Sequence, residues 1–320
     1  MSHFKKQRLF SSIVSIAFFV IFAGIGAHYL LESHADPLGA FAEAENGTLT
    51  SPAFVANDPT ASNGEAVQFG TATNGASTEH IITSLYAYPT LSAWSQVEQA
   101  APVVKYAIVN ICAPDGTGSG CGSPADEKNS DWVPTIQSLV SNAITPLYYI
   151  STNYGATSLS VLEGELQNAI AWYGIASPMF DTTAISGNCS NGDSPIPCTT
   201  YYDDLYTYAV SIGATAVVYN PGAIPPSNYM FGPKVIMQVY EGSASGFQDT
   251  TFPSWMSNYP ASEFAATLSA GTSSSIGTDV TDALHDDIGN IYEDDEAEPP
   301  NYSMLPAYWH AEVTDVQNAE

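Results

Sequence analysis

The sequence predicts a (β/α)8 barrel, a closed ring of eight parallel strands surrounded by helices, over residues 81–320. Short apolar, β-branched or tyrosine-rich runs alternate there with stretches of helical pattern. Such alternation is typical of a parallel sheet, and eight strands in about 230 residues fit a closed barrel. An open, doubly wound sheet is the alternative, although no Gly-x-Gly-x-x-Gly motif follows the first strand to indicate a bound nucleotide.

Eight runs have the length and composition of buried parallel strands, and helical stretches separate most of them. Pro178 is awkward within a central strand, but proline is tolerated as the first residue of one. We therefore expect strands at residues 81–88, 103–111, 145–150, 178–180, 215–219, 235–240, 264–268 and 290–292, and helices at residues 92–100, 132–142, 158–172, 200–212 and 279–287.

The N-terminal segment, residues 1–31, has the pattern of a signal anchor. Three basic residues lie within the first eight positions, and residues 9–31 contain no charged side chain. A run of this length can span a bilayer, and the basic flank predicts that the rest of the chain lies outside the cell. Residues 33–35, Ser-His-Ala, leave cleavage as the alternative, in which case the protein is secreted.

Residues 32–80 predict a linker followed by a short β-rich segment. Residues 41–50 and 61–70 resemble the opening two strands of carbohydrate-binding β-sandwich modules. About thirty residues match, too few for a whole sandwich of roughly 100. The expected divisions are therefore an anchor at 1–31, this segment at 32–80 and the barrel at 81–320.

The charge of the chain is strongly acidic, with 33 acidic and 6 basic side chains and a net charge of −27. Only Lys105, Lys128 and Lys234 are basic after residue 31. Phosphate backbones would be repelled, so we expect no nucleic-acid partner. A neutral or cationic polymer is compatible with this charge, and so is an acidic surface that only keeps the protein soluble.

The four cysteines form two pairs, each nine residues apart: Cys112 with Cys121, and Cys189 with Cys198. Both pairs bracket loops rich in glycine, proline or serine. Four cysteines allow three connectivities, of which local pairing is the simplest and would indicate an oxidising compartment. Free thiols or a zinc site are alternatives, but the spacing is wide for zinc and no paired histidines accompany it, so we expect no metal.

Two of the predicted strands end in a single carboxylate. Residues 175–181 deliver Asp181, and residues 235–241 deliver Glu241. The carboxyl ends of barrel strands carry the chemistry of barrel enzymes, and alternate strands contribute to the same layer. Two carboxylates are what glycosidic bond cleavage requires. The alternative is that each acid caps the helix that follows it.

Further polar and aromatic side chains follow other predicted strands. Amides there could bind sugar hydroxyls or orient a carboxylate, tyrosines could form a stacking wall, and an acidic run at residues 293–298 could hold a sugar amine or calcium, or be a solvated loop. We expect no cofactor, since no motif for one is present. The candidate substrate-binding residues are Tyr88, Asn110, Tyr149, Tyr154, Asn220 and Asp294.

Seven short motifs in order resemble the spherulin-4-like family, which includes fungal glycoside hydrolases that cut α-1,4-linked galactosamine polymers. The likeness runs from about residue 83 to residue 309, nearly the whole predicted barrel. The motifs are Leu-Tyr-Ala-Tyr-Pro at 85–89, Tyr-Ala-Ile-Val-Asn at 106–110, Tyr-Tyr at 148–149 with Thr-Asn-Tyr-Gly at 152–155, Met-Phe-Asp at 179–181, Val-Tyr-Asn-Pro-Gly at 218–222, Val-Tyr-Glu at 239–241 and Leu-Pro-Ala-Tyr-Trp at 305–309.

The resemblance implies that Asp181 and Glu241 are the catalytic pair of a glycoside hydrolase. Because the more buried of two such carboxyls should keep a raised pKa and act as the acid, we expect Glu241 to be the acid/base and Asp181 the nucleophile or electrostatic stabiliser. It departs from the family at Thr182, where a second acid, a glutamate, is usual. We therefore expect an exported hydrolase that cleaves an amino-sugar-containing polysaccharide. A non-catalytic carbohydrate-binding barrel and a cell-surface structural protein are the alternatives.

Overall fold

The computed structural model describes residues 53–57, 65–69, 79–111, 128–191 and 194–319. The chain divides into two compact units, Met1–Asn74 and Gly75–Glu320. The predicted anchor at residues 9–31 and the predicted pair of Cys112 and Cys121 lie outside the described residues. Among the residues that are described, no helix combines the length and apolar character needed to cross a membrane.

The first unit contains one described hairpin. Strand β1, Ala53–Asn57, pairs antiparallel with β2, Glu65–Phe69, so that Val55 lies opposite Val67.

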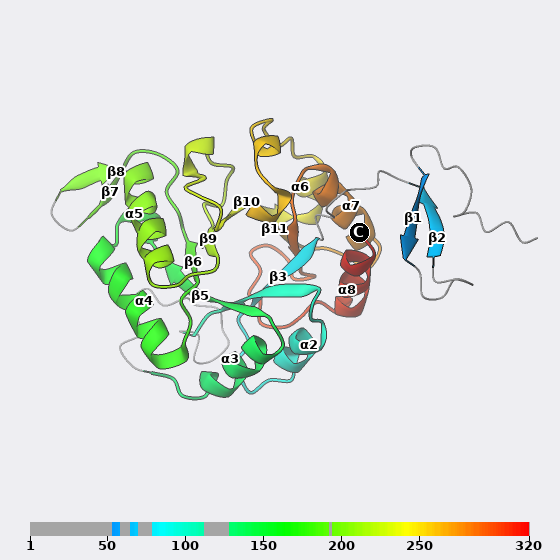
Figure 1. Ribbon diagram of the computed structural model, residues 1–320, viewed down its shortest axis with the longest axis horizontal. Helices are drawn as coiled ribbons and strands as arrows, with labels where there is room; N and C mark the ends of the chain where they lie inside the picture. Colours follow the sequence, from blue (N-terminus) through cyan, green and yellow to red (C-terminus); the bar gives the residue numbers. More distant parts are fainter. Residues whose placement is uncertain (1–52, 58–64, 70–78, 112–127, 192–193, 320) are drawn as a thin grey trace, which may run out of the picture. The chain divides into compact units, whose positions relative to one another are not determined.

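The second unit is a closed barrel of eight parallel strands, which confirms the predicted fold class (Figure 1). Each strand overlaps one of the eight predicted runs, and Pro178 is the first residue of its strand, as expected. Around the ring the strands are β3 (His80–Leu85), β4 (Val104–Val109), β5 (Thr145–Ser151), β6 (Pro178–Asp181), β9 (Val217–Tyr219), β10 (Val235–Ser243), β11 (Phe264–Ser269) and β12 (Asn290–Glu293).

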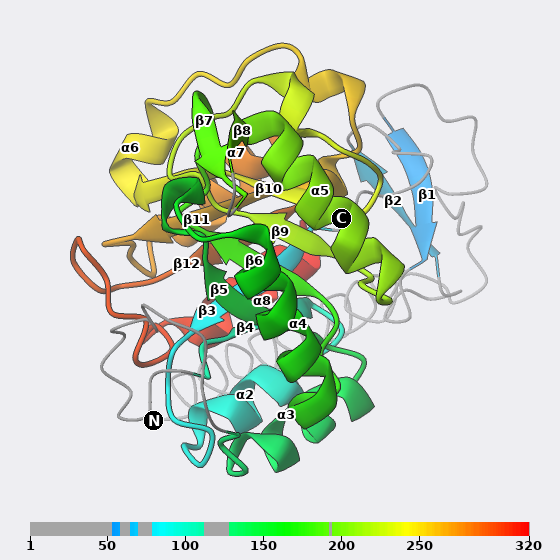
Figure 2. The same ribbon diagram turned by 90° about the vertical axis from the view of Figure 1, so that its left-hand side faces the viewer.

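Helices cover the outside of the ring, as Figures 1 and 2 show. All five predicted helices are present as α2 (Ala93–Gln99), α3 (Trp132–Ser141), α4 (Leu159–Tyr173), α5 (Cys198–Ser211) and α7 (Ile276–His285). Helix α4 ends at Gly174, whose φ of 75° is the left-handed conformation that glycine adopts most easily.

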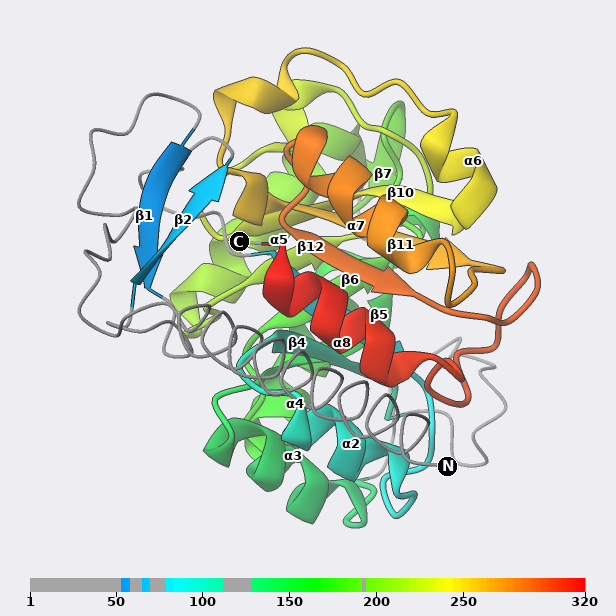
Figure 3. The same cartoon turned by 90° about the vertical axis from the view of Figure 1, so that its right-hand side faces the viewer.

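Two α-helices and two strands of the described barrel unit were not predicted. Helix α6, Ala244–Gln248, is too short to show a periodic pattern, and α8, Trp309–Asn318, is largely polar. Helix α8 packs beside α7 on the outside of the barrel (Figure 3). Strands β7, Asn188–Ser190, and β8, Pro195–Pro197, form a small hairpin between β6 and α5.

The apolar core has two layers, as expected for a barrel whose strands are buried on both faces. The outer layer lies between strands and helices and includes Trp94, Trp132 and Phe264. The inner layer fills the ring with one apolar side chain from most strands, so the lower part of the barrel is packed solid. Its members are Ile82, Ile108, Leu147, Met179, Ala216, Val218, Ile236 and Ala265.

Candidate active site

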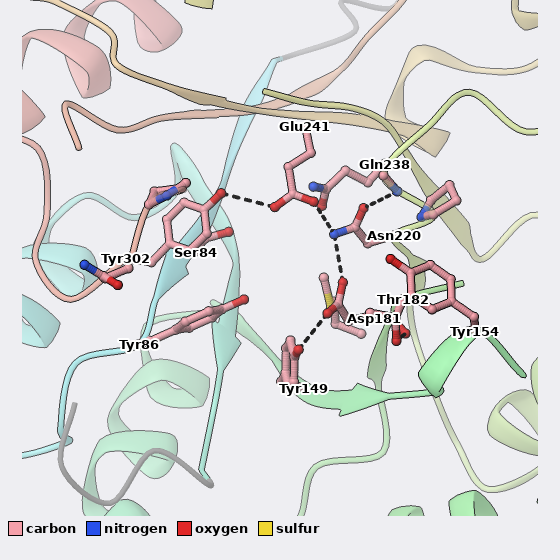
Figure 4. Close-up of a pocket in the computed structure, with 15 residues that line it drawn as sticks. Ser84, Tyr86, Tyr149, Tyr154, Asp181, Thr182, Asn220, Gln238, Glu241 and Tyr302 are labelled. Atoms are coloured by element: carbon pink, nitrogen blue, oxygen red, sulfur yellow. Dashed lines mark hydrogen bonds between the residues drawn. The ribbon is translucent and has the colours of Figure 1, made fainter. Parts of the chain in front are cut away.

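A pocket of about 270 Å³ opens at the carboxyl end of the barrel strands, above the inner apolar layer. Its lining comes from strands β3, β5, β6 and β10 and from loops that follow the barrel strands, and Figure 4 shows these side chains converging. None of the residues that line it is a lysine or an arginine. They are Ser84, Tyr86, Tyr149, Tyr154, Met179, Asp181, Thr182, Asn220, Pro221, Gly222, Gln238, Glu241, Pro300, Asn301 and Tyr302.

The amide of Asn220 joins the two predicted catalytic carboxylates (Figure 4). Its Nδ2 donates to Oδ1 of Asp181 at 2.9 Å and to Oε2 of Glu241 at 2.7 Å. Its Oδ1 accepts the backbone N–H of Gly222 at 3.0 Å, and this fixes which end of the amide faces the acids. Both carboxylates therefore lie in one mouth, as their positions on strands four and six predict.

The backbone of Asn220 is tied to the strand that carries Asp181. Its N–H donates to the carbonyl of Phe180 at 2.9 Å, and its own carbonyl accepts the N–H of Thr183 at 2.9 Å. Because these bonds flank Asp181 on both sides, the amide and the aspartate keep a fixed relation.

Tyrosine hydroxyls bind the remaining carboxylate oxygens. Tyr149 donates to Oδ2 of Asp181 at 2.6 Å, and Tyr302 donates to Oε1 of Glu241 at 3.2 Å. Each acid therefore accepts one amide and one phenol hydrogen bond. Neither carboxylate caps a helix: α6, which follows Glu241, is capped by the side chain of Ser243. The helix-cap alternative is therefore wrong for this pair.

The environment of Glu241 favours its protonated form. Burial of the carboxyl among the pocket walls is the main cause that raises its pKa, and the negative charge of Asp181 adds to it. The hydrogen bonds from Asn220 and Tyr302 act in the opposite direction. The side chain remains open to solvent through the pocket, so it combines access to a ligand with a raised pKa.

A β-bulge in β10 brings two of its side chains to the pocket. The register against β11 shifts between Gln238 and Tyr240, so that one residue is inserted in the strand. In a regular strand, residues three apart point to opposite faces. Because of the bulge, Gln238 and Glu241 both line the pocket.

One rim of the pocket is built from backbone in the left-handed region. Asn153, Tyr154 and Thr182 have φ values of 48°, 52° and 52°, which side chains with a Cβ rarely adopt. The N–H of Tyr154 donates to the carbonyl of Thr182 at 2.8 Å, and the Thr182 hydroxyl bonds Ser151 at 2.8 Å. This cross-linking holds Tyr154 at the rim with 64% of its surface exposed.

The disulfide between Cys189 and Cys198 confirms the predicted local pairing and supports the same rim. Gly155 has a φ of 74°, and a Cβ placed on it would lie 2.0 Å from Sγ of Cys189. Only glycine therefore fits between the disulfide and the loop that carries Tyr154.

Three predicted substrate-binding residues do not line this pocket. Tyr88 lies beyond the end of β3, and its hydroxyl donates to Asp131 at 2.5 Å. Asn110 is buried, and its amide has no hydrogen-bond partner in the described part of the chain. Asp294 is fully buried, where it accepts hydrogen bonds from Tyr292 and from the N–H of Glu296.

Tyr302, Tyr86, Ser84 and Gln238 are among the pocket residues that sequence reasoning did not single out. Tyr302 is on a loop after β12 that has no strand pattern. Tyr86 and Tyr88 have the same strand parity, so the alternation did not separate them. Ser84 is the inward-facing residue of β3 that precedes Tyr86. The orientation of Gln238 depends on the bulge in β10, which the sequence does not show. Within the described ranges, no group of three or more histidine, cysteine, aspartate or glutamate side chains is placed to hold a metal ion.

The barrel unit matches one protein family and is similar to solved structures. The model of the family described as Spherulation-specific family 4 matches residues 80–316. The structure of Aspergillus clavatus Sph3 in complex with GalNAc superposes with a TM-score of 0.57 at 20% identity, covering 75% of this chain and 98% of that one. An O-GlcNAc hydrolase from Thermobaculum terrenum gives 0.42 at 13% identity, covering 74% and 58%. No curated protein sequence matches.

Proposed function

Because the chain belongs to spherulation-specific family 4, we propose that it is a glycoside hydrolase of amino-sugar-containing polysaccharides, with Asp181 and Glu241 as its catalytic pair. The observation that carries the proposal is the Asn220 amide, which binds both carboxylates in one open pocket. Two carboxyl groups with different environments are the arrangement that glycosidic cleavage uses.

Glu241 is the acid/base in this proposal. Its raised pKa leaves the carboxyl protonated to a higher pH than an ordinary glutamate, so it can give a proton to the glycosidic oxygen as the bond to the anomeric carbon breaks. The leaving chain then departs as an alcohol. In a second step Glu241 takes a proton from the attacking water.

Asp181 is the nucleophile. Tyr149 and Asn220 each donate a hydrogen bond to it, and these two bonds orient its oxygens. One oxygen bonds to the anomeric carbon as the leaving group departs, and water later breaks that bond and restores the carboxylate.

The spacing of the pair favours retention of anomeric configuration. Oδ1 of Asp181 and Oε2 of Glu241 bind the same nitrogen, at 2.9 Å and 2.7 Å, so they lie no farther apart than these two bonds laid end to end. Retaining enzymes hold their carboxyl groups about 5–5.5 Å apart, whereas inverting enzymes need roughly 6.5–9.5 Å to admit a water.

Amino sugars are the proposed substrate class for two reasons. The structurally similar Sph3 was solved in complex with GalNAc, and the pocket carries two carboxylates and no basic side chain. Polymers of N-acetylgalactosamine and of galactosamine are therefore the first substrates to test.

A non-catalytic carbohydrate-binding barrel is the second candidate, and Thr182 favours it. The family resemblance places a glutamate at this position, whereas the threonine hydroxyl here bonds Ser151 and lines the pocket. A protein that kept the sugar site but had lost one acid would bind polymer without cutting it.

The experiment is a reducing-end release assay on N-acetylgalactosamine, galactosamine and N-acetylglucosamine polymers, with binding to each polymer measured in parallel. The hydrolase proposal expects new reducing ends on at least one polymer. Binding without release would select the binding module, and a gain of activity in Thr182→Glu would identify the wild type as a weakened enzyme. Neither binding nor release would leave a structural role.

Export and membrane anchoring through residues 9–31 remain proposals. The Cys189–Cys198 disulfide supports export, because disulfides persist in oxidising compartments. Fractionation of cells that express the full chain should place the protein with the membranes; recovery in the medium of a chain that starts near residue 36 would indicate cleavage instead.

A further inference from the structure

Three buried or partly buried polar side chains line the pocket and have no hydrogen-bond partner among the described residues. They are the hydroxyls of Ser84 and Tyr86 and the amide of Gln238, which we call the free polar face. Ser84 and Gln238 are 4% and 2% exposed, so their contact with solvent is confined to the pocket. Polar groups at such depth are normally paired.

The free polar face lies directly above the apolar interior. Two residues before Ser84 and Gln238, at the same inward positions of β3 and β10, are Ile82 and Ile236 of the inner core layer. The change from isoleucine to a polar residue marks the floor of the pocket. Packing does not require polarity there, because an apolar side chain would continue the layer at lower cost.

Tyr86 differs from the two tyrosines beside it. Its ring lies edge-on between Tyr149 and Tyr302, with centroids 5.7 Å and 5.3 Å away. Those two hydroxyls are taken by Asp181 and Glu241, whereas the hydroxyl of Tyr86 points into the pocket and bonds neither acid (Figure 4). Burial and the neighbouring acids raise its pKa well above the usual value, so it remains a neutral donor.

We propose that the free polar face selects the sugar next to the cleaved bond. It does so by hydrogen bonding to an uncharged substituent of the sugar ring, either a hydroxyl or an acetamido group. This inference rests on the proposed hydrolase function. None of the three side chains is charged, and together they offer two hydroxyls and an amide that donates and accepts. Asp181 and Glu241 catalyse the cleavage, and the free polar face determines which sugar binds beside them.

Substitutions that remove one polar group and keep the shape test the proposal. Ser84→Ala, Tyr86→Phe and Gln238→Met each delete a hydrogen-bonding group of the face. Thr83→Val is the matched control, because Thr83 is a fully buried residue of the same strand whose hydroxyl also has no partner in the described structure but does not line the pocket. Thermal melting of each variant checks folding.

Binding of N-acetylgalactosamine, galactosamine and galactose is measured by calorimetry. In addition, kcat/KM is measured on the polymer that the wild type cuts. Each face variant should weaken binding of the preferred sugar and lower kcat/KM by about 3- to 10-fold, the usual effect of one lost hydrogen bond. Thr83→Val should bind and turn over as wild type does. Preference for N-acetylgalactosamine over both other sugars would identify an acetamido group as the bound substituent. Equal binding of all three sugars would identify a hydroxyl as the bound substituent.

Wild-type affinity and rate in all three face variants would overturn the inference and leave the hydrolase proposal standing. A wild-type protein that neither binds nor cuts any of these sugars would overturn the proposed function, and this inference with it. The same pH dependence of kcat/KM in Tyr86→Phe and wild type is also expected, because its hydroxyl bonds neither acid; a shifted profile would show that Tyr86 acts through Glu241 instead.

Discussion

Two sets of carboxyl groups in the barrel unit have different surroundings, although each contains a glutamate whose pKa is raised by burial, Glu241 in one and Glu293 in the other. Asp181 and Glu241 lie in an open pocket, and hydrogen-bond donors reach each of their carboxylates. The second set, which we call the sealed acidic cluster, consists of Asp279 on α7, Glu293 on β12 and Glu312 on α8. All three side chains are 0% exposed. One oxygen of each has no partner among the described residues.

The sealed acidic cluster is held by neutral donors and by protonation. Glu293 accepts from the hydroxyl of Tyr308 at 3.1 Å, and its own N–H donates to Glu312 at 2.9 Å. Burial raises the pKa of Glu293 to about 8 and that of Glu312 well above its usual value. Glu293 and Glu312 therefore stabilise the contact between α8 and β12 in their protonated form.

The comparison teaches that a raised pKa alone does not identify a catalytic residue. Burial raises the pKa in both places, for Glu241 and for Glu293. Only in the pocket is the carboxyl also open to a ligand and oriented by a shared amide. Substitutions in the pocket should therefore change the rate of hydrolysis, whereas substitutions in the sealed acidic cluster should change the stability of the fold.

Apart from the two carboxylates themselves, the shared amide should have the largest effect when it is replaced. Asn220→Ala removes the group that binds both carboxylates, and small displacements of catalytic groups cost about 100-fold in rate. We expect the loss in kcat rather than in KM. Asn110→Ala is the control, because this buried amide also follows a barrel strand but bonds neither acid. Equal losses of kcat in both variants would show that the amide of Asn220 has no special role.

Removing the disulfide behind the rim should cost stability more than rate. Cross-links over loops this short stabilise by about 2–3 kcal/mol through the entropy of the unfolded chain. The double variant Cys189→Ala with Cys198→Ala should therefore lose that much free energy of unfolding in a denaturant titration. An unchanged free energy would mean that the loop is already ordered in the unfolded chain.

The sealed acidic cluster should make the protein less stable as the pH rises. A carboxyl whose pKa is higher in the folded chain favours folding only while it is protonated, so its contribution is complete below about 4.5 and is lost as the pH rises through about 8 for Glu293. Each unit of difference in pKa corresponds to about 1.4 kcal/mol. Denaturant midpoints at pH 5, 7 and 9 should fall in that order.

Glu312→Gln tests this dependence, because the amide oxygen can still accept from the N–H of Glu293 and the side chain can no longer ionise. Its stability should depend less on pH than that of the wild type, with an unchanged rate of hydrolysis. Stability that rises from pH 5 to pH 9 in the wild type would contradict the account of the cluster.

The smallest effect should come from the tyrosine that bonds Glu241. Its hydrogen bond lowers the pKa of Glu241, so Tyr302→Phe should move the alkaline limb of the kcat/KM profile slightly upward. Tyr308→Phe removes the equivalent donor from the sealed acidic cluster and should leave the profile in place. A downward shift in Tyr302→Phe would show that Tyr302 does not stabilise the ionised form.

The strand pattern predicted the barrel because parallel strands buried on both faces leave continuous apolar runs, as in Val217–Tyr219. It also predicted the pocket pair, since a strand that ends in one acid is visible in the chain. The role of Gln238 depends on a register shift that only pairing with β11 reveals. Tyr302 comes from an irregular loop, and the sealed acidic cluster needs two helices to pack on β12, so neither leaves a periodic signal.

The most direct test of the central claim compares kcat for Asp181→Asn, Glu241→Gln and the double variant on the polymer that the wild type cuts. Both substitutions keep the shape of the side chain and remove the charge or proton that cleavage needs. We predict a loss of about 100- to 10,000-fold in each single variant. Because the two groups act in one mechanism, the double variant should be little worse than the poorer single one. Near-wild-type kcat in either single variant, in a protein that remains folded, would contradict the account.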